Sequence, residues 1–161
     1  MIHSDGAKGG DWLRSEKRYG DFILKLDWKV SKEGNSGVFI RVSDTGAPWQ
    51  TGYEVQISNQ FRDEKHCTGA LYGYAAVKPR PDETADKWHT FEIHCVGSKI
   101  KVIADGVTVI DVDQKTLSAP DEQGYTDPKT KPVRGYIGLQ DAHAPAGHYI
   151  EFRNVRVKEV K

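Results

Sequence analysis

The fold is decided by one stretch of strict alternation, Phe22-Ile23-Leu24-Lys25-Leu26-Asp27-Trp28-Lys29-Val30. Large apolar side chains occupy every second position, and three of the four residues between them are charged. A period of two sends one set of side chains into a core and the other towards water, which is typical of a half-buried β-strand. The stretch therefore predicts a strand on one face of a hydrophobic core.

The alternation returns in shorter runs that we predict as strands: Val38–Val42, Tyr53–Ile57, Phe91–Cys95, Ile100–Ala104, Val107–Val109, Tyr136–Gln140 and Tyr149–Val157. Asp105-Gly106 separates two β-branched runs and predicts a tight hairpin, because a type I′ turn needs positive φ at both central residues. A change of phase near Arg153-Asn154 indicates a β-bulge. No segment keeps a 3.6-residue period, so helices are expected to be short or absent.

Many short strands without crossover helices favour antiparallel sheets packed face to face. The 161 residues are enough for one two-layer core. We therefore predict an all-β fold, a two-sheet antiparallel jelly-roll sandwich, with residues 1–161 as a single domain. Two long irregular segments, Asn59–Lys87 and Gln114–Val133, are expected to form functional rims around it.

The composition narrows the classes of partner. Lys and Arg sum to 23, as do Asp and Glu, so the formal net charge is zero. The chain therefore lacks the positive electrostatic field that would attract nucleic acid or an anionic membrane. No apolar run approaches the roughly 20 residues of a membrane helix, and no signal-peptide pattern is present. Cys67 and Cys95 form neither a disulfide framework nor a zinc-site spacing. Cys95 fits a core position. The sequence leaves open whether Cys67 and Cys95 form a disulfide bond.

The run Tyr53–Ile57 has the most informative polar face, since Glu54 and Gln56 point away from its apolar residues. Arg41 belongs to a neighbouring mixed strand and is expected to lie alongside them. Carboxylate, amide and guanidinium groups near an aromatic ring suit a sugar, whose hydroxyls form hydrogen bonds while its ring stacks. The alternative is a simply solvated sheet face.

Two further candidates lie in predicted loops. Tyr72, in the small-residue segment Thr68–Gly73, offers a phenol as acid, base or hydrogen-bond donor, or else anchors a packed loop. Trp49 is a better candidate for stacking on a ligand than Trp88, which is expected to begin a strand and cap the core. The chain carries no metal-site, nucleotide-binding or nucleophile-elbow motif.

The segment after the predicted strand Tyr136–Gln140 is also rich in polar groups. Gln140, Asp141 and His143 place an amide, a carboxylate and an imidazole at one edge of the sandwich, where the carboxylate could tune the imidazole. A turn-forming Asp141 with an exposed His143 is equally compatible with the sequence. Gly34-Asn35-Ser36-Gly37 is predicted as a tight turn entering a strand.

Six ordered segments resemble the 3-keto-disaccharide hydrolase domain family: Trp12–Phe22, Gly34–Arg41, Gly52–Ile57, Thr68–Gly73, Gly135–Asp141 and Ile150–Val155. The resemblance implies the concanavalin A-like lectin and glucanase sandwich. It also implies cleavage of glycosides already oxidised at carbon 3, by removal of the carbon 2 proton, elimination and hydration. The same sandwich hosts lectins, so a carbohydrate-binding module without turnover is the alternative.

The chemistry that the resemblance implies gives each candidate a role. Glu54 is expected to act as base or metal ligand, Arg41 and Gln56 to contact the substrate or its enolate, and Tyr72 or His143 to donate a proton. A divalent metal ion would be apt for polarising the ketone, with no ligands assigned, and no nucleotide or organic cofactor is expected. The other predicted substrate contacts are Trp49, Gln140 and Asp141.

One departure from the family concerns the N-terminus. Family members usually begin with a further strand that this chain starts too late to contain. Because the terminal strands of such a sandwich pair with each other, we expect an unpaired sheet edge, left by a truncated chain or covered by a second copy in a homo-oligomer. The resemblance also implies export to the periplasm or the cell exterior.

Overall fold

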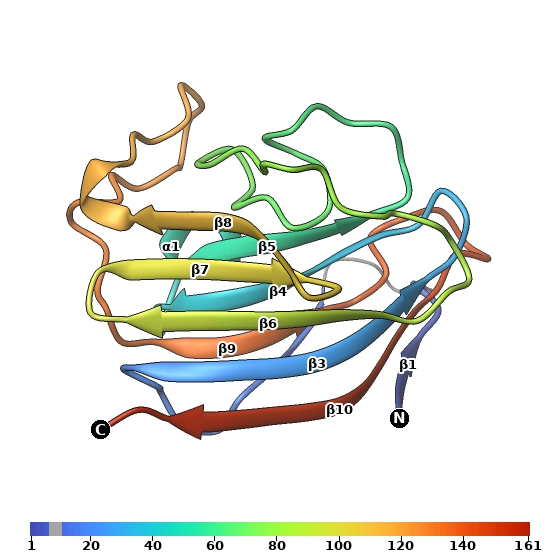
Figure 1. Cartoon of the computed structure of the whole chain (residues 1–161), viewed down its shortest axis with the longest axis horizontal. Helices are drawn as coiled ribbons and strands as arrows, with labels where there is room; N and C mark the ends of the chain where they lie inside the picture. Colours follow the sequence, from blue (N-terminus) through green and yellow to red (C-terminus); the bar gives the residue numbers. More distant parts are fainter. Residues whose placement is uncertain (7–10) are drawn as a thin grey trace.

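The computed structural model describes residues 1–6 and 11–161, whose strands form two antiparallel sheets (Figure 1). One sheet has the order β1-β10-β3-β6-β7-β8, and the other has the order β2-β9-β4-β5. The elements are β1 (Ile2–Ser4), β2 (Trp12–Arg14), β3 (Phe22–Val30), β4 (Asn35–Val42), α1 (Pro48–Thr51), β5 (Tyr53–Ser58), β6 (His89–Val96), β7 (Lys99–Ala104), β8 (Val107–Asp113), the 3-10 turn η1 (Gln114–Thr116), β9 (Tyr136–Gln140) and β10 (Ile150–Glu159). The predicted all-β sandwich is confirmed, and both helical elements are short.

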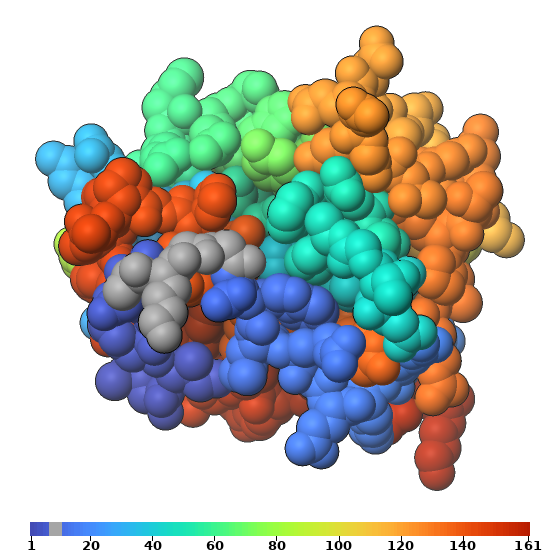
Figure 2. All heavy atoms as spheres, turned by 180° about the vertical axis from the view of Figure 1, so that it is seen from behind, coloured from blue at the N-terminus to red at the C-terminus, as the bar shows by residue number. Residues whose placement is uncertain are grey.

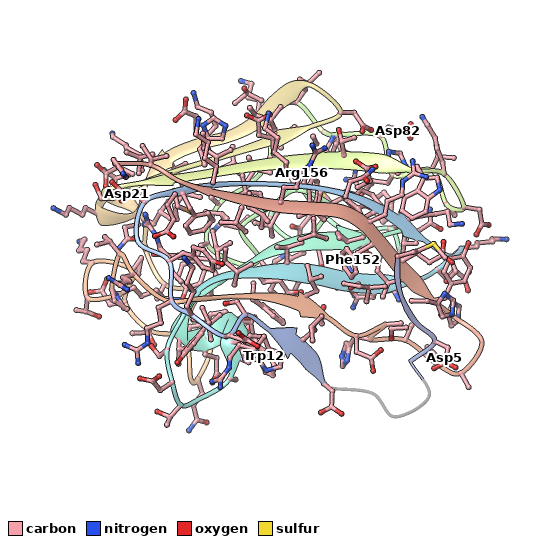
Figure 3. All side chains as sticks on the ribbon, turned by 90° about the horizontal axis from the view of Figure 1, so that it is seen from below. Asp5, Trp12, Asp21, Asp82, Phe152 and Arg156 are labelled. Atoms are coloured by element: carbon pink, nitrogen blue, oxygen red, sulfur yellow. The ribbon has the colours of Figure 1, made fainter. Side chains whose placement is uncertain are left out.

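The core fills the space between the two sheets (Figure 3). The apolar residues of β3 that alternate from Phe22 to Val30 are each at most 2% exposed. They form one cluster with residues of the second sheet such as Val38 and Val55. Burying one such side chain stabilises the fold by roughly 1.5–3 kcal/mol, so the period-two pattern fixes which face of each strand turns inward.

The predicted hairpin and bulge are both present. Asp105 and Gly106 have φ of 46° and 82°, as a type I′ turn between β7 and β8 requires. In β10 the pairing with β3 shifts register between Arg153 and Arg156, and Asn154 has φ of 53°.

The expected unpaired edge is occupied within the chain. Ile2 and Ser4 of β1 pair with Phe152 and Ile150 of β10. The expectation of an unpaired terminal edge is therefore wrong for residues 150–152 of β10, and a homo-oligomer stays a proposal.

Both cysteines are free and buried, so Cys67 and Cys95 are not bridged. Each thiol sits in the hydrophobic cluster, the role predicted for Cys95. Among the residues that the structure describes, no helix is long and apolar enough to span a membrane.

Candidate active site

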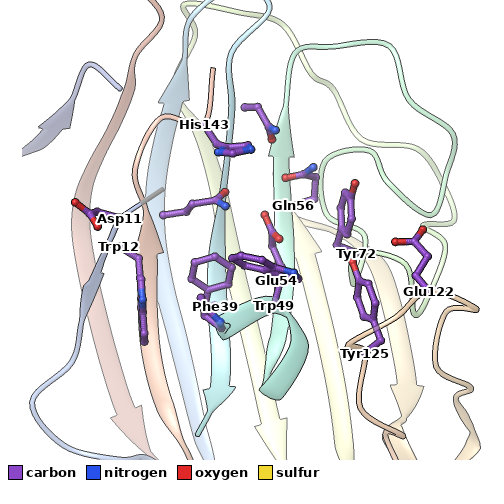
Figure 4. Close-up of a pocket in the computed structure, with 13 residues that line it drawn as sticks. Asp11, Trp12, Phe39, Trp49, Glu54, Gln56, Tyr72, Glu122, Tyr125 and His143 are labelled. Carbon is purple, nitrogen blue, oxygen red and sulfur yellow. The ribbon is translucent and has the colours of Figure 1, made fainter. Parts of the chain in front are cut away.

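A cleft of about 300 Å³ lies over the outer face of the four-stranded sheet (Figure 4). At its centre is β5, whose alternation sends Tyr53, Val55 and Ile57 into the core and leaves Glu54 and Gln56 on the cleft side. Figure 2 looks onto this side of the molecule, where α1 and the residues around β2 border the cleft. The described residues lining the cleft are Asp11, Trp12, Asn35, Phe39, Pro48, Trp49, Glu54, Gln56, Tyr72, Glu122, Tyr125, Gln140 and His143.

Glu54 is a nearly buried carboxyl group, with 7% of the residue exposed. Its carboxylate has no hydrogen-bond or ion-pair partner within residues 1–6 and 11–161. Burial raises the pKa of Glu54 to about 8, and the positive charge of Arg62 opposes the rise. A carboxyl group that gains and loses its proton near neutral pH is suited to exchanging a proton with a ligand.

Three side-chain amides line the same cleft, from Asn35 of β4, Gln56 of β5 and Gln140 of β9. Asn35 Oδ1 and Gln140 Oε1 are buried and have no hydrogen-bond partner in the described part of the chain. Leaving such an oxygen unpaired costs about 1–3 kcal/mol, which a ligand with hydroxyl donors would offset. Gln56 Oε1 instead accepts the Ile57 N–H at 3.1 Å, so the Gln56 amide nitrogen is left as a donor.

Two phenols enter the cleft from the irregular segments, Tyr72 and Tyr125 (Figure 4). The Tyr72 N–H donates to the Glu54 carbonyl oxygen at 2.9 Å, and the Tyr72 ring meets the His66 ring at 4.8 Å in an edge contact. Tyr125 packs on Tyr74 at 5.6 Å. Burial raises the pKa of Tyr125 to about 12, so this phenol stays protonated at neutral pH and can donate.

Aromatic rings form the remaining wall. Trp12 of β2 and Phe39 of β4 meet edge to face at 5.7 Å. Pro48 and Trp49 of α1 line the cleft beside them, and Trp49 is 38% exposed. The predicted stacking residue therefore lies at the cleft and is partly exposed.

His143 and Gln140 line the cleft, but Asp141 does not. The Asp141 carboxylate accepts the N–H of Ala142 at 2.7 Å, and its side chain lines a separate groove beside Ile2. The expectation that Asp141 contacts the same ligand is corrected by this placement, because its carboxylate is used locally in the turn after β9.

Arg41 is turned away from the cleft. The pairing of β4 with β9 shifts register between Phe39 and Val42, and Arg41 has φ of 56°. Such an irregularity interrupts the alternation and reverses the direction of the next side chain. Arg41 is fully buried, and its guanidinium donates to Gln114 Oε1 and the Gly97 carbonyl oxygen, each at 2.6 Å. The expectation that this guanidinium faces the substrate is wrong.

Two buried basic side chains, Arg41 and Lys131, instead hold the 114–135 segment, which supplies part of the cleft rim, and burial lowers the pKa of Lys131 to about 7. Gln114 accepts from Arg41 and donates to the Lys131 carbonyl oxygen at 2.9 Å. Lys131 Nζ in turn donates to the carbonyl oxygens of Gln50 and Gly52, next to α1. These two side chains hold the rim in position and do not line the cleft.

Seven lining residues were not predicted as site residues from the sequence, namely Asp11, Trp12, Asn35, Phe39, Pro48, Glu122 and Tyr125. Trp12 and Asn35 lie in segments that carried the family resemblance, although Asn35 was interpreted as a turn residue and in fact begins β4. Tyr125 belongs to an irregular segment that was expected to form a rim. No pattern in that segment could indicate which of its side chains reaches the cleft.

The described residues of the cleft assign no ligand set for a metal ion. The cleft contains the carboxyl groups of Asp11, Glu54 and Glu122 and the imidazole of His143. No three His, Cys, Asp or Glu side chains of the described chain converge as metal ligands. The expected divalent ion therefore has no assigned ligand set.

Comparisons with known proteins agree with this architecture. A family model described as the 3-keto-alpha-glucoside-1,2-lyase-like domain matches residues 1–158. The structure of a candidate glycosyl hydrolase from Parabacteroides distasonis ATCC 8503 is 26% identical, covers 93% of this chain and 83% of its own, and superposes with a TM-score of 0.78.

Two solved structures from Bacillus subtilis share the fold at lower identity. The carbohydrate-binding module CBM66 is 18% identical, with a TM-score of 0.58 over 92% of this chain and 81% of its own. A protein of unknown function with a galectin-like fold is 13% identical, with a TM-score of 0.60 over 98% of this chain and 81% of its own. The jelly-roll class of the sandwich is thereby confirmed. No curated protein matches the chain.

Proposed function

The chain belongs to the 3-keto-alpha-glucoside-1,2-lyase-like domain family, and on that premise we propose that its cleft cleaves glycosides oxidised at carbon 3. Membership of this family supports a carbohydrate-acting role. The finer assignment rests on Glu54, the buried carboxyl group at the centre of the cleft.

The proposed reaction begins at carbon 2. A ketone at carbon 3 acidifies the carbon 2 hydrogen, so a modest base can remove it. The electron pair of that C–H bond passes through an enolate into a C1=C2 double bond, the C1–O bond breaks, and the leaving oxygen takes a proton. Water then adds across the double bond, which places a hydroxyl on carbon 1 and a proton on carbon 2.

Glu54 is the proposed base. The pKa of about 8 makes its carboxylate a stronger base than an exposed glutamate, while a useful fraction stays ionised near neutral pH. Because its carboxylate has no partner in the described chain, no ion pair needs to break before a substrate proton is transferred.

Neutral groups are the proposed partners of the enolate and the leaving oxygen. The amides of Gln56, Asn35 and Gln140 can donate to the enolate oxygen or to sugar hydroxyls, and Tyr72, Tyr125 or His143 can protonate the leaving group. No Lys or Arg occurs among the lining residues that the structure describes. Such a lining suits an uncharged sugar better than a uronic acid.

The divalent ion expected from the chemistry stays a proposal without ligands, and no step is derived through it. Two other functions have specific support. The partly exposed Trp49 resembles a sugar-stacking platform, as a carbohydrate-binding module would need. Asp11 and Glu122 provide further carboxyl groups for ordinary glycoside hydrolysis, although both are exposed at the rim.

The deciding experiment measures cleavage of 3-ketotrehalose and of a 3-keto-β-glucoside, each compared with its unoxidised parent sugar. It is run once with protein treated with a chelator and once with divalent ions added. We expect cleavage of the oxidised sugars only. The variant Glu54→Gln keeps the side-chain shape and should lose about 100-fold or more in kcat, the usual contribution of a general base.

The matched control is Glu122→Gln, another cleft carboxyl group, which should keep kcat within a few-fold. Wild-type kcat in Glu54→Gln would rule out this residue as the base. Cleavage of the unoxidised parents with loss of activity in Glu122→Gln would favour ordinary glycoside hydrolysis. Binding of the sugars without any cleavage would favour the carbohydrate-binding module.

A further inference from the structure

The floor of the cleft has a polar half and an aromatic half, and Gly37 and Gly138 provide the space that lets the side chains of Glu54 and Trp12 lean towards opposite halves. In the pairing of β4 with β5, Glu54 lies opposite Phe39 and Gln56 lies opposite Gly37. A Cβ added to Gly37 would lie 2.6 Å from Glu54 Oε1 and 2.8 Å from its Cγ. The Glu54 side chain therefore leans along the sheet, away from Phe39 and over Gly37.

The indole of Trp12 leans in the opposite sense. Trp12 pairs with Gln140 of β9, but a Cβ added to Gly138 would overlap the Trp12 ring. Gly138 is the residue that pairs with Phe39. The indole therefore extends away from Gln140 towards Phe39, and its ring meets the Phe39 ring.

The side of the cleft towards which Glu54 leans is the polar half, where Figure 4 shows Gln56 and His143. Asn35 belongs to this half because its carbonyl oxygen accepts the His143 N–H at 2.7 Å, and Gln140 belongs to it because the Trp12 indole extends away from Gln140. Asn35 is 9% exposed and its Oδ1 has no partner in the described chain, as is also true of Gln140 Oε1. Buried acceptors without donors favour a ligand that presents several hydroxyl groups here.

The other side is the aromatic half, defined by Trp12, Phe39, Pro48 and Trp49. None of these side chains titrates, and only the indole N–H groups of the two tryptophans can form hydrogen bonds. Rings of this kind hold the flat apolar face of a ligand by stacking, worth about 0.5–1.5 kcal/mol for each ring pair beyond burial.

We propose that the oxidised sugar binds in the polar half and that its leaving group stacks on the aromatic half, so the site selects leaving groups with a flat apolar face. This inference rests on the proposed function, because it assigns the two ends of a 3-keto-glycoside to the two halves. The Glu54 carboxylate, leaning over Gly37, then meets carbon 2, and the C1–O bond crosses to the aromatic half. Both a phenolic ring and the apolar face of a second hexose have the required shape.

The test compares three 3-keto-glucosides that share the sugar and differ in the leaving group: phenyl, glucosyl and methyl. Trp49→Ala removes an exposed ring and should lower kcat/KM for the phenyl and glucosyl compounds about 10-fold, the equivalent of one good stacking contact. The methyl compound should change less than about 3-fold, since a methyl group is too small to stack.

The variant Asn35→Ala is the matched control in the polar half, and its loss in kcat/KM should be equal for all three compounds. Gly138→Ala, which displaces the Trp12 ring, should reproduce the selectivity of Trp49→Ala if that variant does not fold. The assignment would be overturned if Trp49→Ala and Gly138→Ala each lowered kcat/KM equally for all three leaving groups, or if neither variant lowered it. If these variants lowered kcat/KM for the phenyl compound alone, the site would select aryl leaving groups and not a second sugar.

Failure of the proposed function has a different signature. If wild-type protein cleaves none of the three, the halves can still be tested by titrating the unoxidised phenyl and methyl glucosides against protein fluorescence. Tighter binding of the phenyl compound that disappears in Trp49→Ala would retain the two halves and reject only the chemistry. Equal binding of both compounds would reject the halves as well.

Discussion

At the scale of single residues, burial sets the properties of the Glu54 carboxyl group. Its pKa is about 8 in the folded chain, against 4.5 for an ordinary glutamate. Between these two values the folded state binds more protons than the unfolded state, so the stability that Glu54 contributes is complete below pH 4.5 and is lost as the pH rises through 8. The group proposed for catalysis is therefore also a source of instability in alkali.

Glu54→Gln should remove that pH dependence. We expect the variant and the wild type to unfold at similar temperatures near pH 5, with the variant progressively more stable towards pH 9, by an amount on the order of a few kcal/mol in the free energy of unfolding. Thermal or urea unfolding across this range measures the difference. Parallel stability curves from pH 5 to 9 would mean that Glu54 is not desolvated as described.

Glu92 is the matched control, because the hydrogen bonds from Lys25 and then His94 lower its pKa. Its contribution is present above pH 4.5 and is lost as the pH falls below that value. Glu92→Gln should therefore show a constant offset from wild type between pH 5 and 9.

The sequence predicts some of these residue positions and not others. Glu54 and Gln56 could be placed because β5 keeps an unbroken period of two from Tyr53 onwards. Arg41 follows the same pattern in the sequence, but the irregularity in β4 reverses it, and no side-chain alternation encodes a positive φ at a non-glycine residue. Tyr125 depends on the path of a loop, which is set by contacts distant in the chain.

At the scale of elements, the strands act through the spaces they leave as well as the side chains they present. Gly37 and Gly138 lie in the centre of the four-stranded sheet, where glycine ordinarily weakens a strand. Here each glycine accommodates a long side chain from the neighbouring strand, Glu54 in one case and Trp12 in the other. The sequence showed both glycines, but their use becomes apparent only once the strand register is known.

Gly37→Ala should displace the Glu54 carboxylate and leave the sheet intact. Gly37 has no positive φ, and the atoms that the new methyl group would meet belong to a flexible side chain. We expect kcat to fall about 10- to 100-fold, as for a reacting group moved by roughly 1 Å, with a stability change of about 1 kcal/mol or less. Steady-state kinetics and thermal unfolding measure the two effects.

Gly20→Ala is the silent control for this substitution, because no atom lies within 4 Å of a Cβ at Gly20. It should match wild type in both measurements. Full activity in Gly37→Ala would show that the position of Glu54 over this glycine does not matter for the reaction.

At the scale of the whole molecule, the sandwich interior supports the cleft rim. The two-layer arrangement followed from alternation alone, whereas the strand order and the covering of β10 by β1 depend on pairings between distant segments. The buried Arg41 illustrates the difference. It passes through the core to hold Gln114 and Gly97, so one charged residue couples the interior to the segment that carries Tyr125.

Arg41→Met tests whether this cation supports the rim or binds substrate, as its sequence position suggested. Methionine fills much of the same space but leaves Gln114 Oε1 and the Gly97 carbonyl oxygen without donors, at about 1–3 kcal/mol for each buried acceptor. We expect a lower unfolding temperature and faster amide exchange across residues 114–135, whereas Arg156→Met, an exposed arginine on β10, should leave both unchanged. If the Arg41→Met protein kept wild-type stability and amide exchange but had a raised KM, the result would contradict the supporting role and indicate that Arg41 contacts the substrate.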